Sequence, residues 1–149
     1  MDNMTNKEYQ QYVERKKPKP TYFKNTLSAF IVGGLICLLG QIIRNFLFRF
    51  GLDEKTVSTA TSILLIFLGS FLTGLGIYDK IGKVGGAGAA VPITGFANSI
   101  VSPAMEFKRE GFIFGVAARM FSIAGPVLVY GISSSIIVGI LYLLLTRGG

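Results

Sequence analysis

Residues 84–103 read Val-Gly-Gly-Ala-Gly-Ala-Ala-Val-Pro-Ile-Thr-Gly-Phe-Ala-Asn-Ser-Ile-Val-Ser-Pro. This stretch is apolar, but its glycines and prolines interrupt a regular helix, and it lies between segments long enough to cross a bilayer. Lipid cannot hydrogen-bond the backbone groups that a broken helix exposes. Such backbone is therefore tolerated in a membrane only when protein covers it or when it lines a watery cavity. The stretch predicts a pore or a binding site.

The composition is that of a membrane protein. Hydrophobic residues make up 50% of the 149 residues, charged residues make up 15%, and the mean hydropathy is +0.54. These values are too apolar for an ordinary soluble domain of this size. Residues 26–47 and 57–78 each provide the roughly 20 residues needed to cross about 30 Å of hydrocarbon. We therefore predict an all-α, polytopic membrane protein with a single membrane domain over residues 26–149.

A third apolar run, residues 112–146, is too long for one perpendicular span. As a single helix it would extend about 52 Å at roughly 1.5 Å per residue. Proline removes a backbone donor, so we expect this run to break at Gly125-Pro126. The predicted last span is then residues 121–145, preceded by a shorter lead-in at 106–120.

Two topologies remain open for the broken segment. If it is re-entrant, the protein has three full spans and an external C terminus. If it crosses, four spans bring Arg147 back to the side of the N-terminal tail, which satisfies the positive-inside rule slightly better.

The N-terminal tail, residues 1–25, is basic. Its cations are Lys7, Arg15, Lys16, Lys17, Lys19 and Lys24. By the positive-inside rule these residues place the tail in the cytoplasm. The cluster at 15–19 also fits a patch for anionic lipid or a partner protein.

Tyr9, Tyr12 and Val13 are spaced to form one face of a short surface helix, which Pro18 and Pro20 would end. A basic tail beside a membrane explains the pI near 9.7 without nucleic-acid binding. We therefore expect a lipid membrane, and no nucleic acid, beside this tail.

The first half of the broken segment supplies candidate pore-lining backbone. Gly85, Gly86 and Gly88 free the main chain, and Pro92 stops a regular helix. If Pro92 opens a half-helix, the free N–H groups near residues 92–95 favour an anionic ligand.

The second half adds neutral groups. Thr94, Asn98 and Ser99 offer hydrogen bonds and Gly95 exposes backbone, which together suit an uncharged lining. The competing interpretation is close helix packing, because small residues let backbones approach one another in lipid.

Polar residues in the other spans are further candidates for contact with solute. Gln41 and Arg44 lie three residues apart in the first span, near one helix face. A charge within hydrocarbon normally faces a bundle interior, a cavity or a partner. Alternatively, Arg44 snorkels to the outer headgroups and the span ends near Ile43.

Arg119 lies at the start of the last span and has two interpretations. It attracts an anion, or it marks the cytoplasmic interface beside an amphipathic lead-in. The polar side of that lead-in would consist of Glu106, Lys108, Arg109 and Glu110.

Small residues recur at four-residue spacing at Ser70 and Gly74, and again at Gly131, Ser135 and Gly139. We interpret these stripes as packing seams between helices or subunits. A bundle this small cannot enclose a solute path alone, so we expect an oligomer.

The sequence gives little support for an enzyme. The chain has no histidine, its one cysteine, Cys37, lies within the first span, and no acidic residue lies deep in a span. Gly86-Ala87-Gly88 lacks the preceding strand and the third glycine of a dinucleotide fingerprint. Nor do the residue spacings form a metal-ligand cluster. We expect no enzyme, no catalytic residue, no metal and no cofactor.

The string at residues 85–99, with Glu-Phe-Lys-Arg-Glu-Gly-Phe at 106–112 just after it, resembles the SpoVA family of sporulation membrane proteins, and the resemblance covers nearly the whole chain. It implies a multi-pass protein of the forespore or spore inner membrane. The implied role is transport of dipicolinic acid, as its calcium chelate, into the developing spore and out of it at germination, with tension-gated channel behaviour. The implied partners are other SpoVA membrane subunits, particularly the related AE-type protein, and a thiolase-like soluble subunit that binds dipicolinate.

Two functional hypotheses follow. In the first, the chain conducts solute passively through an oligomeric pore, with residues 85–99 as its constriction or gate. In the second, it is a non-conducting assembly or anchoring subunit of the same membrane complex.

Overall fold

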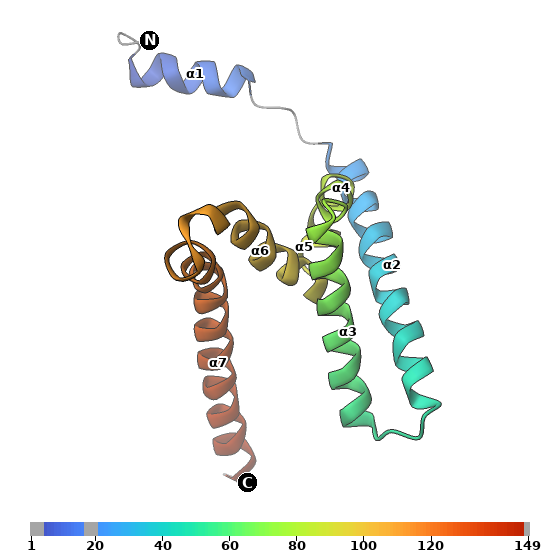
Figure 1. Cartoon of the computed structure of the whole chain (residues 1–149). Coiled ribbons are helices and arrows are strands. Elements are labelled where there is room, and N and C mark those ends of the chain that lie inside the picture. The colour runs from blue at the N-terminus through green and yellow to red at the C-terminus, as the bar shows by residue number, and fades with distance from the viewer. Residues whose placement is uncertain (1–4, 17–20, 148–149) are drawn as a thin grey trace.

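The computed structural model describes residues 5–16 and 21–147, and these are helical with no strand among them. Figure 1 shows three long helices joined near one end by a group of short ones. In chain order the elements are α1 (Asn6–Lys16), α2 (Tyr22–Phe48), α3 (Glu54–Gly74), α4 (Tyr78–Gly85), α5 (Ala87–Ala90), α6 (Ile93–Glu106), the 3-10 helix η1 (Phe107–Glu110), the π-helix η2 (Phe112–Ala117) and α7 (Ala118–Arg147). The all-α prediction is confirmed.

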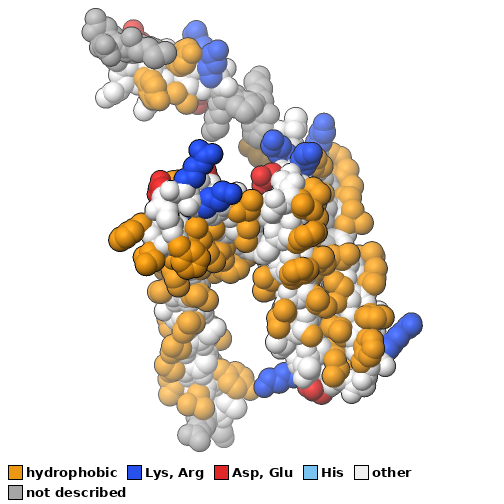
Figure 2. Space-filling view, viewed as in Figure 1, with side chains coloured by type: hydrophobic (Ala, Val, Ile, Leu, Met, Phe, Trp, Pro, Cys, Tyr) orange, Lys and Arg blue, Asp and Glu red, His pale blue; other side chains and the backbone are white. Residues whose placement is uncertain are grey.

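Three helical stretches are long and apolar enough to cross a membrane: Tyr22–Phe48, Glu54–Gly74 and Phe112–Thr146. Figure 2 shows charged side chains gathered at the two ends of the bundle, with hydrophobic side chains covering the middle. This distribution matches a bilayer, which accepts charge at its surfaces and excludes it from its centre. The prediction of a polytopic membrane protein is confirmed.

The second span ends earlier than the predicted residue 78. Gly76 has φ +67°, its N–H bonds to the carbonyl of Thr73 at 2.9 Å, and the N–H of Ile77 bonds to the carbonyl of Leu72 at 2.9 Å. This pair of bonds is the Schellman motif that ends a helix at a left-handed glycine. Tyr78 therefore begins α4 instead of closing α3.

The broken segment does not cross the bundle. In Figure 1, α4, α5 and α6 stay at the end where α2 begins, and α6 leads across to the start of α7. The C-terminal end of α7 lies at the opposite end, which is also the end of the α2–α3 loop. With three candidate spans and a broken segment that stays at one end, this arrangement fits the topology in which the segment is re-entrant.

The break expected at Gly125-Pro126 is absent, because α7 continues through Pro126. In lipid, a break would expose several backbone groups, whereas a proline within a helix loses a single bond. The chain turns instead at Gly111, which has φ +97°, and continues through η2 into α7. The last helix therefore begins at Ala118, three residues before the predicted span.

The tail contains the short helix that the tyrosine spacing predicts, namely α1. Thr5 and Glu8 form a capping box, in which the Glu8 carboxylate accepts the Thr5 N–H at 2.9 Å. The backbone N–H and then the hydroxyl of Thr5 hold the pKa of Glu8 below its usual value. Pro18 and Pro20, which we expected to end this helix, lie outside the described residues.

Candidate functional site

The broken segment is fixed to its neighbours by two hydroxyl groups. Tyr78, at the start of α4, is 4% exposed, and its hydroxyl lies 2.8 Å from the carbonyl oxygen of Ala89 and 2.7 Å from Oγ1 of Thr94. A phenol has one proton, so Tyr78 donates to one of these oxygens and accepts from the Thr94 hydroxyl when it donates to the carbonyl. The pair connects α4, α5 and α6 at one buried point.

A second polar contact joins α6 to α3. The Thr73 hydroxyl lies 2.6 Å from the carbonyl oxygen of Gly69 and 2.9 Å from the side-chain oxygen of Asn98. Its single proton serves one acceptor at a time, so Asn98 competes with the helix backbone for it. Asn98 is thereby held at the face of α6 that packs on α3.

Three of the predicted glycines occupy close helix contacts. A methyl group on Gly88 would overlap the backbone of Ala29 in α2, and one on Gly95 would overlap the carbonyl oxygens of Ala89 and Ala90. A methyl group on Gly85 would lie 2.6 Å from Cγ1 of Val32. Absent side chains at these positions allow backbones to approach, as the packing interpretation anticipates.

Four predicted residues come together on one cavity of about 470 Å³: Gly86, Gly95, Asn98 and Ser99. The cavity lies between α4, the α5–α6 corner and Val127 of α7, and Tyr78 forms part of its wall. None of the described residues that line it carries a formal charge. We call it the neutral cavity.

The remaining residues of the broken segment lie around this cavity. Pro92 is the residue before α6, so the condition that it opens a half-helix is met. Thr94 lies behind the wall, bonded to Tyr78. Gly85 and Gly88 contact α2.

Gln41 and Arg44 lie far from the neutral cavity. They follow Ala29, the level at which α2 meets Gly88, by 12 and 15 residues, so Arg44 lies about 22 Å further along the helix. Gln41 bonds to Asn45 at 2.8 Å, and Arg44 pairs with Glu54 across the α2–α3 loop at 2.8 Å. These contacts fit the alternative in which Arg44 marks the end of the span, although α2 itself continues to Phe48.

Arg119 lies at the first turn of α7 and is exposed. Its guanidinium carbon is 3.9 Å from the centre of the Phe107 ring, a cation–π distance. Lys108 and Arg109 lie in the adjoining η1, and both are exposed. The position fits an interfacial arginine and is separate from the residues that line the neutral cavity.

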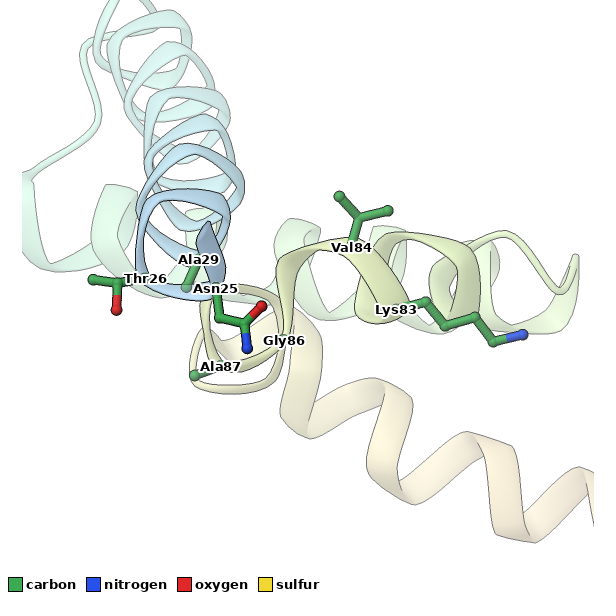
Figure 3. A pocket seen from close by; sticks show the side chains of 7 residues that line it. All are labelled: Asn25, Thr26, Ala29, Lys83, Val84, Gly86 and Ala87. Carbon is green, nitrogen blue, oxygen red and sulfur yellow. The ribbon is translucent and has the colours of Figure 1, made fainter. Parts of the chain in front are cut away.

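Figure 3 shows another hollow, of about 590 Å³, between the start of α2 and the α4–α5 corner. Asn25 points toward Gly86, whereas the side chain of Lys83 extends away along α4. Lys83 nevertheless belongs to the described residues that line this hollow, so a positive charge lies at its edge.

Sequence reasoning missed Tyr78 and Thr73, the two residues that hold the site together. Tyr78 was placed at the end of the span 57–78, and Thr73 was not singled out. The available signal was Gly76, a turn residue placed just before an isolated tyrosine and a charged pair. Among the described residues, no group of three or more His, Cys, Asp or Glu lies together to hold a metal ion.

Comparison of the sequence with known proteins places the chain in a family. The chain is 49% identical over 141 residues to the stage V sporulation protein AC of Bacillus subtilis (strain 168), covering 93% of this chain and 94% of that protein. No solved structure matches the chain. The model of the SpoVAC/SpoVAEB sporulation membrane protein family matches residues 25–141, which run from the first turn of α2 through most of α7. The chain therefore belongs to the SpoVAC/SpoVAEB family of sporulation membrane proteins.

Proposed function

We propose that this protein is a channel subunit that conducts dipicolinic acid, as its calcium chelate, across the inner membrane of the spore. It serves uptake during sporulation and release during germination. The sporulation relative and family support the setting, and the resemblance of residues 85–99 to the SpoVA family supports the solute. The N-terminal tail lies in the cytoplasm, as its basic residues favour.

The observation that carries the proposal is the neutral cavity. It gathers hydrogen-bonding side chains and glycines beside the broken segment, in a protein whose long helices are predominantly apolar. A neutral chelate of a dicarboxylate with a divalent cation requires polar contacts but no fixed countercharge. An uncharged lining with Asn98 and Ser99 fits such a solute.

A complete path requires further subunits. Figure 2 shows an opening between α7 and the α2–α3 hairpin, and α7 makes its main contacts within the chain with α6 and η2. Three spans arranged in this way do not surround a channel. We propose that copies of this chain, or the related AE-type subunit, close the path, and that a thiolase-like soluble subunit delivers or retains dipicolinate.

The glycine contacts favour a second candidate function. Gly85, Gly88 and Gly95 are in tight contact with neighbouring atoms, as in a scaffold whose task is to hold a complex together. In that case the chain assembles or anchors a pore built by other subunits and carries no solute itself.

Dipicolinate release from loaded liposomes separates the two functions. Val127 lines the neutral cavity, whereas Val129 lies two residues away on α7, is 62% exposed and does not line it. Val127→Trp should strongly reduce release, detected by terbium luminescence outside the vesicles, and Val129→Trp should leave it unchanged. The assay uses this chain alone and together with the AE-type subunit.

Equal release by wild type and Val127→Trp would overturn the pore-lining assignment. Ser99→Leu provides a second way to fill the cavity should Val127→Trp fail to insert into the membrane. Release that requires the AE-type subunit and ignores both substitutions would establish the assembly function.

A further inference from the structure

A second, apolar cavity of about 430 Å³ lies between α2 and α3, next to α4. Its walls include Leu35, Ile36 and Leu39 from α2, Leu68 and Leu72 from α3, and Ile81 from α4. We call it the α2–α3 slot. Tyr78 and Thr94 complete its wall at the side of the broken segment.

Helix contacts close the slot at both ends. At one end, Val32 contacts Gly85, where an added methyl group would lie 2.6 Å from Val32. At the other end, the space above Gly40 is taken by Leu65, whose Cδ1 would lie 3.4 Å from an added methyl group. The two closing contacts are eight residues apart on α2, which is about 12 Å. A helix with its side chains is itself about 10–12 Å wide, so a helix of another subunit could not lie along the slot. Its occupant must be a thin chain.

The chemistry of the walls selects an apolar occupant. The two hydroxyl-bearing residues of the lining are Tyr78 and Thr94, and when Tyr78 donates to the Ala89 carbonyl and accepts from Thr94, both hydroxyl protons are used within the protein. Leu35 and Leu39 at the mouth are 60% and 43% exposed, and both lie on a membrane-spanning helix. The mouth therefore opens on the hydrocarbon of the bilayer.

From these observations we infer that the α2–α3 slot binds one acyl chain of a bilayer phospholipid. An occupied slot fills space that would otherwise be empty, because water gains no hydrogen bonds there. The same chain contacts the ring of Tyr78, which also forms part of the wall of the neutral cavity. The lipid thus supports the residue that holds the broken segment in place.

Photolabelling tests the inference on the full chain in lipid nanodiscs. The probe is a phospholipid with a diazirine at the middle of one acyl chain, and labelled residues are located by peptide mass spectrometry. Label at Ile36 and Ile81 is compared with label on α7, where Ile136 and Ile137 are 56% and 59% exposed. A free fatty acid with the same diazirine forms a parallel arm.

The decisive comparison uses two substitutions on α3. Leu68→Trp fills the slot, and label at Ile36 and Ile81 should be lost while label on α7 persists. Leu64→Trp, one turn earlier on the same helix and outside the slot, should keep all label. Leu72→Phe fills the slot more gently should Leu68→Trp fail to fold.

Label at Ile36 and Ile81 that persists in both slot-filling variants would overturn the site. Label from the free fatty acid alone would overturn the assignment to phospholipid. Labelling requires no conduction, so a failure of the channel proposal leaves this result standing, and loss of the site leaves the liposome result standing.

Discussion

The broken segment and α7 contain the same small residues in opposite surroundings. Gly88 and Gly95 lie against neighbouring backbone so closely that an added methyl group would overlap it. Around Gly131 and Gly139 in α7, an added methyl group would have no neighbour within 4 Å among the residues that the structure describes, apart from the backbone of its own helix. Glycine in a membrane helix marks close approach in the first region, whereas in the second it leaves a surface that only another molecule can fill.

The test with the largest expected effect replaces one glycine in each region by a bulky residue. Gly88→Leu should lower the free energy of unfolding by about 1–3 kcal/mol or more, because the side chain has no space beside Ala29. Gly131→Leu is the matched control and should change it by less than about 0.5 kcal/mol. Thermal unfolding in detergent, followed by circular dichroism, measures both, and equal losses would contradict the comparison.

A second test asks whether the hydrogen bonds of the two hydroxyl groups stabilise the broken segment in addition to its close packing. Tyr78→Phe leaves the Thr94 hydroxyl without its partner and should cost about 1–3 kcal/mol. A double-mutant cycle with Thr94→Val should give a coupling of about 0.5–3 kcal/mol. Tyr130→Phe, at a residue 76% exposed on α7, is the control and should be close to neutral. Additive losses in the cycle would mean that the two hydroxyls act independently.

A smaller effect is expected at the far end of the α2–α3 hairpin. Arg44→Gln breaks the pair with Glu54, whose side chain is 79% exposed, and should cost about 0.2–1 kcal/mol, less at high salt. Because Arg44 lies far from the broken segment, its loss should add to that of Tyr78→Phe within about 0.5 kcal/mol. Coupling beyond that value would show that the two ends of the hairpin communicate.

The smallest change in the free energy of unfolding is expected for Gly139→Leu, at less than about 0.5 kcal/mol, because no other part of the described chain lies within 4 Å of a methyl group added there. The same substitution should reduce chemical cross-linking between subunits in the membrane, since α7 presents its small-residue stripe outward. Unchanged cross-linking would remove α7 from the subunit contact and leave its glycines facing lipid.

The sequence predicted the long spans well because their signal is local. Twenty consecutive apolar residues have few alternatives in a membrane, so α2, α3 and α7 lie close to their predicted bounds. Pro92 was also recognised as a residue that stops a regular helix, because proline acts on its own neighbours.

The contacts of the site could not be predicted in the same way. Tyr78 and Thr94 are 16 residues apart, and their meeting depends on the corner at Gly76 and on α6 folding back onto α3. The partners of Gly88 lie in α2, almost 60 residues earlier. Such contacts follow from topology, and residue spacing does not reveal them. The effect of Pro126 was misjudged because lipid, unlike water, cannot stabilise an open helix.

Because α7 continues without a break through Pro126, one backbone carbonyl group in the preceding turn lacks its usual hydrogen bond. Proline has no N–H, so the carbonyl oxygen of Ser122, four residues earlier, loses the donor that a regular helix would supply. The Ser122 hydroxyl does not compensate, because it donates to Ala118. A carbonyl oxygen without a hydrogen bond is costly in hydrocarbon, so at this level α7 requires water or a hydrogen-bond donor from an adjoining chain.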